Sequence, residues 1–338
     1  MSAAPLRVAV VGTGGISQAH VTGFRAAGAE IAAICDVSPE LLAARAKLWG
    51  VERTYADYHT MLADDGFDIV AIAAPTAVHH PATVAAAAAG KHVLVEKPMA
   101  LDLSLANEMI AACADAGVLL GVNHQLRSSG PARKARELID AGAIGRLTHV
   151  RLRQAHDWGG KGVTPSFTTK ASAGGGTMLD NGCHLADLAR FLGGSVAEVY
   201  ARMGTLRYAV EVEDNAHISV RFDDGAIGVI ETSWSATGWE EGFWLYGSEG
   251  ALECTNRYGP PTVRHSYRSS PGQAWDETDV TVHSFSGSVN HTRHVLGFVN
   301  AVKGEGPLVC TGEDGREAVR IILAAYRSAE LGAPVRLT

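Results

Sequence analysis

The chain has 338 residues, of which 46% are hydrophobic and 19% charged, so it can bury a full core and is neither disordered nor fibrous. This length predicts two domains. The 36 acidic and 29 basic residues give a net charge of −7, which argues against a nucleic-acid binder or a polybasic membrane-surface protein. No apolar run is suited to span a bilayer, and no secretory signal pattern is visible. Five scattered cysteines without a CxxC pattern predict reduced thiols in a cytoplasmic protein.

The first part of the chain, residues 1–124, alternates short β-branched runs with alanine-rich helical stretches. Continuous apolar strands separated by helices predict a parallel sheet covered on both faces, which is a doubly wound α/β domain. The predicted strands are 7–11, 30–35, 68–73, 92–95 and 118–122. The predicted helices are 16–27, 39–49, 81–89 and 104–116.

The sequence pattern changes in the second part, residues 125–338, where strands of alternating polarity are separated by turn residues. This pattern predicts an α/β domain with an open, largely antiparallel sheet. A helix at 131–141 precedes the strands, and a turn with a helix at 173–187 interrupts them. Residues 255–290 predict loops with weak strands, and helices are predicted at 294–303 and 313–331. Thr311 and Asp314 supply a capping box for the last helix. The predicted strands are 147–154, 196–202, 216–222, 226–234, 242–246 and 251–254.

A glycine-rich turn follows the first predicted strand. Gly12 suits a tight turn, Gly14 lets backbone amides approach a pyrophosphate, and a helix starting near Gly15 directs its positive end at the phosphates. The third position of the GxGxxG pattern holds Ser17 instead of glycine or alanine. Such a turn alone is weak support for a nucleotide site, because glycine also serves plain turns.

Asp36 ends the second predicted strand, where a carboxylate can accept both hydroxyls of an adenosine ribose. The same carboxylate repels a 2′-phosphate, and Val37 and Ser38 offer no cation to hold one, so NAD is favoured over NADP. The alternative is that Asp36 only caps the following helix, but Ser38 already fits that position.

Polar residues follow two later strands, at the sheet edge where open α/β folds bind ligands. Glu96 and Lys97 come directly after a buried strand, where charge is costly without a partner. Lys97 can place a cation beside a substrate hydroxyl and favour the alkoxide that develops as hydride leaves carbon. The alternative reading is a solvated loop lysine.

Asp180, His184 and Asp187 share one face if a helix begins near Asp180. A histidine one turn from a carboxylate is a plausible pair for proton transfer. The preceding Gly174, Gly175 and Gly176 let the backbone pass close to a flat ligand or bend sharply. Two alternatives stay open: a helix cap with a buried histidine, or a divalent metal site, although no HxH or HExxH pattern supports metal and we expect none.

Taken together, the glycine-rich turn, Glu96-Lys97-Pro98 and the GGGxxxDxGxHxxD run from Gly174 to Asp187 resemble the Gfo/Idh/MocA family of oxidoreductases, essentially from Arg7 to Leu337. The resemblance implies a Rossmann domain, a second α/β domain whose sheet often forms dimer or tetramer contacts, and reversible oxidation of a secondary alcohol on a sugar or cyclitol by NAD(P). It assigns Lys97, Asp180 and His184 as the catalytic trio. The cofactor-binding residues it implies are Gly12, Gly14, Gly15, Ile16, Asp36, Pro75, Thr76, His79, Glu96, Lys97 and Asn123.

The substrate is argued from hydrogen-bonding groups beside an aromatic ring, which suit a polyhydroxylated ring with apolar C–H faces. A neutral monosaccharide, glycoside or inositol is favoured because no cluster of arginines marks a phosphate pocket. Two alternatives are a glycosidase or lyase that uses NAD for transient C3 oxidation, and a non-catalytic NAD-bound regulator. The expected substrate-binding residues are His124, Arg127, His156, Trp158, Asp180 and His184, with Asp157, Lys161 and Thr168 nearby.

Overall fold

The computed structural model describes residues 4–158, 169–170, 174–257, 262–270, 273–281 and 287–337. They group into two compact units. Unit 1 combines the chain up to Ser128 with helix α9 and the chain after it up to Arg316, and unit 2 contains the remaining residues. Among the described residues, no helix has both the length and the apolar character that crossing a membrane requires.

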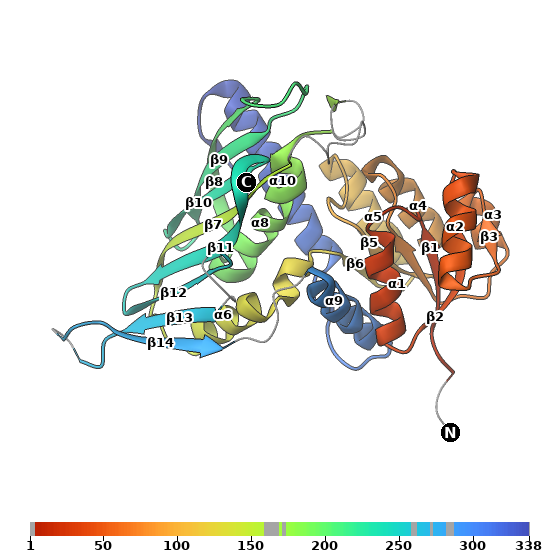
Figure 1. The fold of residues 1–338 in the computed structure, drawn as a ribbon, viewed down its shortest axis with the longest axis horizontal. Helices are drawn as coiled ribbons and strands as arrows, with labels where there is room; N and C mark the ends of the chain where they lie inside the picture. The colour runs from red at the N-terminus through yellow and green to blue at the C-terminus, as the bar shows by residue number, and fades with distance from the viewer. Residues whose placement is uncertain are drawn as a thin grey trace. The chain divides into compact units, whose positions relative to one another are not determined.

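Unit 1 is built on a six-stranded sheet of order β3-β2-β1-β4-β5-β6, in which every neighbouring pair is parallel, and it confirms the predicted doubly wound fold (Figure 1). The strands are β1 (Arg7–Val11), β2 (Glu30–Cys35), β3 (Thr54–Tyr55), β4 (Ile69–Ile72), β5 (His92–Val95) and β6 (Leu120–Val122). The helices are α1 (Ser17–Ala26), α2 (Pro39–Trp49), α3 (Tyr58–Ala63), α4 (Thr76–Ala88), α5 (Leu103–Asp115), η1 (Gln125–Ser128) and α9 (Gly287–Val302).

Both faces of this sheet are buried. One face packs against α3, α4 and α5, and the other packs against α1, α2 and α9. Helix α9 comes from the far end of the chain and contacts α1 and η1, so the grouping into units differs from a single division between residues 124 and 125. Burial on both sides explains why these strands are continuous apolar runs without polar alternation.

Unit 2 contains a nine-stranded sheet of order β14-β13-β12-β11-β7-β10-β9-β8-β15, in which only the β7–β10 pair is parallel. The sheet confirms the predicted largely antiparallel second domain. Its strands are β7 (Leu147–Asp157), β8 (Val196–Gly204), β9 (Asn215–Phe222), β10 (Ile227–Ser233), β11 (Ser235–Gly247), β12 (Gly250–Thr255), β13 (Thr262–Tyr267), β14 (Asp276–Thr281) and β15 (Val335–Arg336). The helices are α6 (Gly130–Asp140), α8 (Thr177–Gly193) and α10 (Gly312–Leu331), whose first turn belongs to unit 1.

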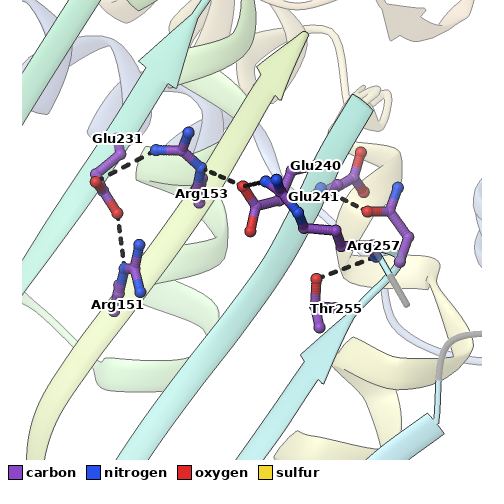
Figure 2. A network of polar contacts seen from close by, with 8 residues as sticks. Arg151, Arg153, Glu231, Glu240, Glu241, Thr255 and Arg257 are labelled. Carbon is purple, nitrogen blue, oxygen red and sulfur yellow. Dashed lines mark hydrogen bonds and ion pairs between the residues drawn. The ribbon is translucent and has the colours of Figure 1, made fainter. Parts of the chain in front are cut away.

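The two faces of the nine-stranded sheet differ. Helix α8 contacts β7, β9 and β10 on one face, where the buried positions of each strand lie. We call the opposite face the open face, because its side chains are half-buried or exposed. Figure 2 shows its centre, where Glu231 of β10 accepts from Arg151 at 2.7 Å and from Arg153 at 3.3 Å. Arg153 also donates to Glu240 of β11 at 2.9 Å.

Several element boundaries differ from the sequence predictions. Helix α4 begins at Thr76 and includes Pro81, whereas the sequence predicts a helix over 81–89. The sequence analysis missed β3 and α3, which are only a few residues long. The segment expected to hold weak strands forms the paired hairpin β13–β14. The predicted capping box is confirmed, with Asp314 N–H donating to Thr311 Oγ1 and Thr311 N–H donating to Asp314 Oδ2, both at 3.2 Å.

Candidate functional site

The glycine-rich turn connects β1 to α1 in unit 1. Gly12 has a φ of +88°, and a Cβ there would lie 2.5 Å from the carbonyl oxygen of Ala73, so no other residue fits. Gly14 and Gly15 have open space around them. Ser17 starts α1, and its hydroxyl donates to the Gly12 carbonyl at 2.8 Å, so the serine closes the turn from within. Ile16 supplies no side-chain cap, which leaves the first amides of α1 available to an anion.

Asp36 lies at the end of β2, beside this turn. Its Oδ2 accepts from the backbone N–H of Thr13 at 2.7 Å and from the Thr13 hydroxyl at 2.9 Å, and its Oδ1 accepts from Ser38 N–H at 2.9 Å. Ser38 caps α2 through its hydroxyl, as expected, so Asp36 is not the helix cap. Three donors hold the carboxylate at the mouth of the turn. Turn, helix end and carboxylate together fit the pyrophosphate and ribose of NAD.

One cation near this turn was missed by the sequence analysis. Arg45 of α2 donates from Nε to the carbonyl oxygen of Thr13 at 3.1 Å. Its guanidinium also lies 5.4 Å from the centre of the Trp49 ring. No local sequence signal identifies it, because it reaches the turn from the second turn of a helix that follows a different strand.

His79 ties together the loops after β4 and β5. Its ring is buried, with Nε2 2.9 Å from the Ala74 carbonyl and Nδ1 2.9 Å from the Pro98 carbonyl. Burial lowers the pKa of His79 below its ordinary value. Pro75 precedes α4 and is exposed, and Thr76 is the first residue of that helix. His79 therefore contacts two backbone carbonyls, one in each of the loops that carry the expected cofactor residues.

Glu96, at the end of β5, is the centre of a buried polar network. Its Oε1 accepts from His20 Nε2 at 2.8 Å and from Asn123 Nδ2 at 2.5 Å, and its Oε2 accepts from the backbone N–H of Lys97 at 3.1 Å. Burial alone would raise the pKa of Glu96, but the hydrogen bonds from His20 and Asn123 and the nearby His291 imidazole hold it well below its ordinary value. The network fixes an ionised carboxylate directly before Lys97.

Two expected substrate residues also lie in unit 1. His124 follows Asn123 and is 1% exposed. Arg127 is buried in η1, and its Nη1 donates to the Asp314 carboxylate at 2.9 Å. This ion pair ties η1 to the start of α10, a structural contact that the sequence analysis did not anticipate.

The run Gly174 to Gly176 immediately precedes α8 in unit 2, with Gly176 at the N-cap position. A Cβ on Gly176 would lie 1.9 Å from the carbonyl oxygen of Glu213, and one on Gly175 would lie 2.1 Å from the hydroxyl of Tyr326. The Glu213 carboxylate accepts from the N–H groups of Gly176 and Met178 and, at 2.7 Å, from the Tyr326 hydroxyl. The glycines therefore allow a carboxylate to cap α8 from outside the helix.

Asp180 lies in the first turn of α8, with His184 one turn later. Their spacing puts them on one side of the helix together with Asp187, as predicted. Asp180 is half-buried, His184 is 5% exposed and Asp187 is fully buried. These residues belong to unit 2, whereas Lys97 belongs to unit 1.

Aromatic rings lie beside the first turn of α8. His156 Nε2 accepts from the Asn181 amide at 3.2 Å, and its ring stacks on Trp239 with centroids 4.7 Å apart. Burial lowers the pKa of His156, while the carboxylates of Asp180 and Asp157 act in the opposite direction. Sequence analysis identified His156 but missed Asn181 and Trp239, which come from α8 and β11.

A second stacked pair continues this aromatic group. Trp158 lies over Trp234 with ring centroids 4.0 Å apart and donates its backbone N–H to the Trp234 carbonyl. Asp157 accepts from the Tyr208 hydroxyl and pairs with Arg207 at 3.1 Å. Two other residues expected near the substrate, Lys161 and Thr168, lie outside the described residues.

Family models match both parts of the chain. Residues 6–124 match the oxidoreductase family with an NAD-binding Rossmann fold, and residues 132–253 match the GFO/IDH/MocA C-terminal domain. The first match confirms the predicted NAD cofactor.

Named relatives match over nearly the whole chain. A 1,5-anhydro-D-fructose reductase from Ensifer adhaerens is 32% identical, with 96% of this chain and 97% of the relative covered. A myo-inositol 2-dehydrogenase from Thermotoga maritima is 28% identical, with 98% of each covered. The solved structure of a levoglucosan dehydrogenase in complex with NADH has a TM-score of 0.92 and 24% identity, covering 99% of this chain and 100% of that one, which shows the shared fold.

Proposed function

The chain belongs to the Gfo/Idh/MocA family of oxidoreductases, and from this premise we propose that it is an NAD-dependent dehydrogenase that reversibly oxidises a secondary hydroxyl of a sugar, glycoside or inositol. The names of its relatives, a reductase of an anhydro-sugar and a dehydrogenase of an inositol, support this substrate class. The observation that carries the chemistry is the placement of Asp180 and His184 one turn apart on one side of α8.

The proposed catalytic residues divide the work. His184 accepts the hydroxyl proton, because an imidazole suits proton transfer near neutral pH. Asp180 orients the substrate hydroxyl or the imidazole, and Lys97 stabilises the developing oxyanion. When bound, NAD supplies the acceptor for the hydride. Glu96, ionised and hydrogen-bonded to the backbone of Lys97, holds the loop that carries the lysine.

We propose that the cofactor is bound by the expected residues of unit 1, with Asp36 as the selector of NAD. The Asp36 carboxylate is anchored by Thr13 and Ser38, so it keeps its place when a ribose arrives. It accepts the two ribose hydroxyls and repels a 2′-phosphate. Arg45 pairs its Nε with the Thr13 carbonyl, and this contact directs the guanidinium to the turn backbone.

For the substrate, we propose a neutral polyhydroxylated ring bound beside α8. The Asp180 carboxylate acts to raise the pKa of His156, so the two groups interact electrostatically. The Trp158 ring lies 6.2 Å from the His156 ring, centroid to centroid, and adds an aromatic face. Aromatic rings suit the apolar C–H faces of such a ring, and polar groups suit its hydroxyls.

We propose further that the protein is a homo-dimer or homo-tetramer assembled through the open face of the nine-stranded sheet. This face carries both signs of charge in neighbouring rows, with Arg151 and Arg153 beside Glu231 (Figure 2). It also carries exposed apolar groups, Ile227 at 57% and Tyr246 at 44% exposure. A face with mixed charges is complementary to itself about a two-fold axis. The five free, buried cysteines support a reducing, cytoplasmic location.

A panel of cyclic and acyclic polyols assayed with NAD and NADP in parallel tests the proposed function. We expect NADH formation with at least one sugar or inositol, and a preference for NAD that Asp36→Ala weakens. Release of an aglycone from a glycoside without net NADH would indicate transient oxidation instead. If protein that binds NAD forms no NADH and releases no aglycone, the proposed dehydrogenase activity is contradicted.

A further inference from the structure

A buried histidine on α1 contacts the carboxylate that precedes Lys97. His20 is 0% exposed and lies one turn into the helix that begins at the glycine-rich turn. Its Nε2 is 2.8 Å from Oε1 of Glu96, a residue far away in the sequence. The contact links the helix that receives the cofactor pyrophosphate to the loop that carries Lys97.

The direction of this hydrogen bond follows from the chemistry of its two ends. The hydrogen bonds that Glu96 accepts hold its pKa well below the ordinary value, so the carboxylate is ionised and can only accept. Nε2 of His20 therefore carries the N–H that donates to Oε1 of Glu96. His20 is thus a donor of fixed direction.

Other donors also hold the Glu96 carboxylate. Asn123 Nδ2 donates to Oε1 at 2.5 Å, and the backbone N–H of Lys97 donates to Oε2 at 3.1 Å. The histidines that face it from other elements are His291 of α9, whose ring lies edge-on to His20 with centroids 6.4 Å apart, and His79 of α4. Removing the His20 donor leaves a buried carboxylate short of one partner and weakens the hold on its other oxygen, which accepts from the Lys97 N–H.

We propose that His20 is a positioning residue: through Glu96 it fixes the peptide N–H of Lys97, and so sets where the lysine amine is delivered relative to the cofactor turn. The inference rests on the proposed function, in which Lys97 stabilises the oxyanion. A displacement of about 1 Å in a catalytic group can cost about a hundredfold in rate, so a residue that never touches substrate can control turnover.

Three substitutions separate positioning from packing. His20→Gln retains an N–H near the position of Nε2, His20→Asn carries the same amide on a shorter chain that cannot reach, and His20→Leu keeps the bulk without a donor. His92→Gln is the matched control, because His92 begins the same strand that Glu96 follows and its Nδ1 accepts from Leu119 N–H at 3.0 Å.

The first measurement is steady-state kinetics with the best polyol of the panel. For His20→Asn and His20→Leu we expect kcat to fall about 10- to 100-fold with NAD affinity retained. His20→Gln restores much of kcat, and His92→Gln matches the wild type. Equal kinetics for the glutamine and asparagine variants would overturn the proposal.

The second measurement needs no turnover. Amide hydrogen exchange of the segment containing Lys97 is followed in the NAD complex, and we expect faster exchange in His20→Asn than in His20→Gln. Equal protection in the two variants overturns the positioning role whether or not any polyol is oxidised. A wild type that oxidises no polyol, with the expected exchange difference intact, contradicts the proposed function and leaves the linkage of His20 to Lys97 standing.

Discussion

The two sheets of this protein bury their strands in different ways. The six parallel strands of unit 1 are covered on both faces, and polar groups gather where the chain leaves the strands, at Asp36 and Glu96. The nine-stranded sheet of unit 2 is packed against α8 on one face only, and its other face carries arginines and glutamates along the strands. In the first sheet polar chemistry is confined to strand ends, whereas in the second it is spread over a surface.

The proposed catalytic residues of the two units are therefore held in place by different kinds of contact. Unit 1 holds its residues through a buried network that leaves little freedom to Glu96. Unit 2 holds Asp180 and His184 on a single helix whose start is fixed by Glu213. Substitutions can therefore be chosen to damage one arrangement and leave the other intact.

The largest effect is expected from the catalytic residues themselves. Lys97→Met in unit 1 and His184→Ala in unit 2 should each lower turnover by at least about a hundredfold, because each removes a group that stabilises charge or moves a proton. NAD affinity, measured by fluorescence titration, should be retained in His184→Ala. Wild-type turnover in either variant would remove that residue from the mechanism.

Gly12→Ala tests the cofactor turn of unit 1. The new Cβ would meet the carbonyl oxygen of Ala73 at 2.5 Å in a backbone of positive φ, so the turn must shift. We expect weaker NAD binding and a loss of roughly 1 kcal/mol or more in unfolding free energy. Gly14→Ala, with open space at its Cβ, is the control and should unfold like the wild type. Equal denaturation midpoints for the two variants would contradict the steric argument.

Glu213→Ala tests the cap of α8 in unit 2. It leaves the N–H groups of Gly176 and Met178 and the hydroxyl of Tyr326 without their acceptor. The expected loss is about 1–3 kcal/mol in unfolding free energy, measured in denaturant. Glu211→Ala, at an exposed position whose carboxylate accepts from Lys170 N–H, should change stability by less than about 0.5 kcal/mol.

The core of unit 1 should lose stability in acid through His294. Burial is the main cause that lowers the pKa of His294 to about 3, from an ordinary value of 6.5. Between these values His294 is protonated in the unfolded chain but stays neutral in the folded chain. The free energy of unfolding therefore falls as pH falls from 6.5 toward 3. The slope from this group approaches about 1.4 kcal/mol per pH unit. In His294→Gln the slope between pH 6 and 4 should be smaller by roughly that amount. Parallel stability curves would refute this.

A small effect on folding is expected on the open face. Arg153→Ala breaks ion pairs with Glu231 and Glu240 that are partly exposed, so the unfolding free energy should change by less than about 1 kcal/mol. The self-association measured by sedimentation should weaken if this face joins two copies. An unchanged assembly in Arg153→Ala, Ile227→Asp and Tyr246→Asp alike would place the contact elsewhere.

The sequence predicted the parts of the fold that local patterns encode. Apolar runs and turn glycines predicted the parallel sheet, and the Thr311–Asp314 spacing predicted its capping box correctly. The predicted start of α4 at Pro81 is wrong, because the helix begins at Thr76 and continues through the proline. Ser17 departs from the GxGxxG pattern, and in the structure its hydroxyl donates a hydrogen bond to the Gly12 carbonyl within the turn.

The site was predicted less completely, because its supporting contacts are distant in sequence. His20 falls within the predicted helix 16–27, but no local pattern connects it to its partner Glu96, which follows β5. Glu213 caps α8 from outside the helix, and Trp239 stacks on His156 across two strands. Motifs identify side chains that resemble known chemistry, whereas the residues that hold them depend on which elements become neighbours.

Helix α9 sets a limit on how this protein can be divided experimentally. It packs Val295 and Phe298 into the same cluster as Phe24 of α1, and Gly23 leaves room for Val295 at 2.8 Å from the position of a Cβ. A gene fragment ending after Ser128 would encode every strand of the parallel sheet yet expose that cluster to water, and should aggregate on expression. A soluble nucleotide-binding fragment would need α9 grafted back by a linker or supplied as a separate peptide.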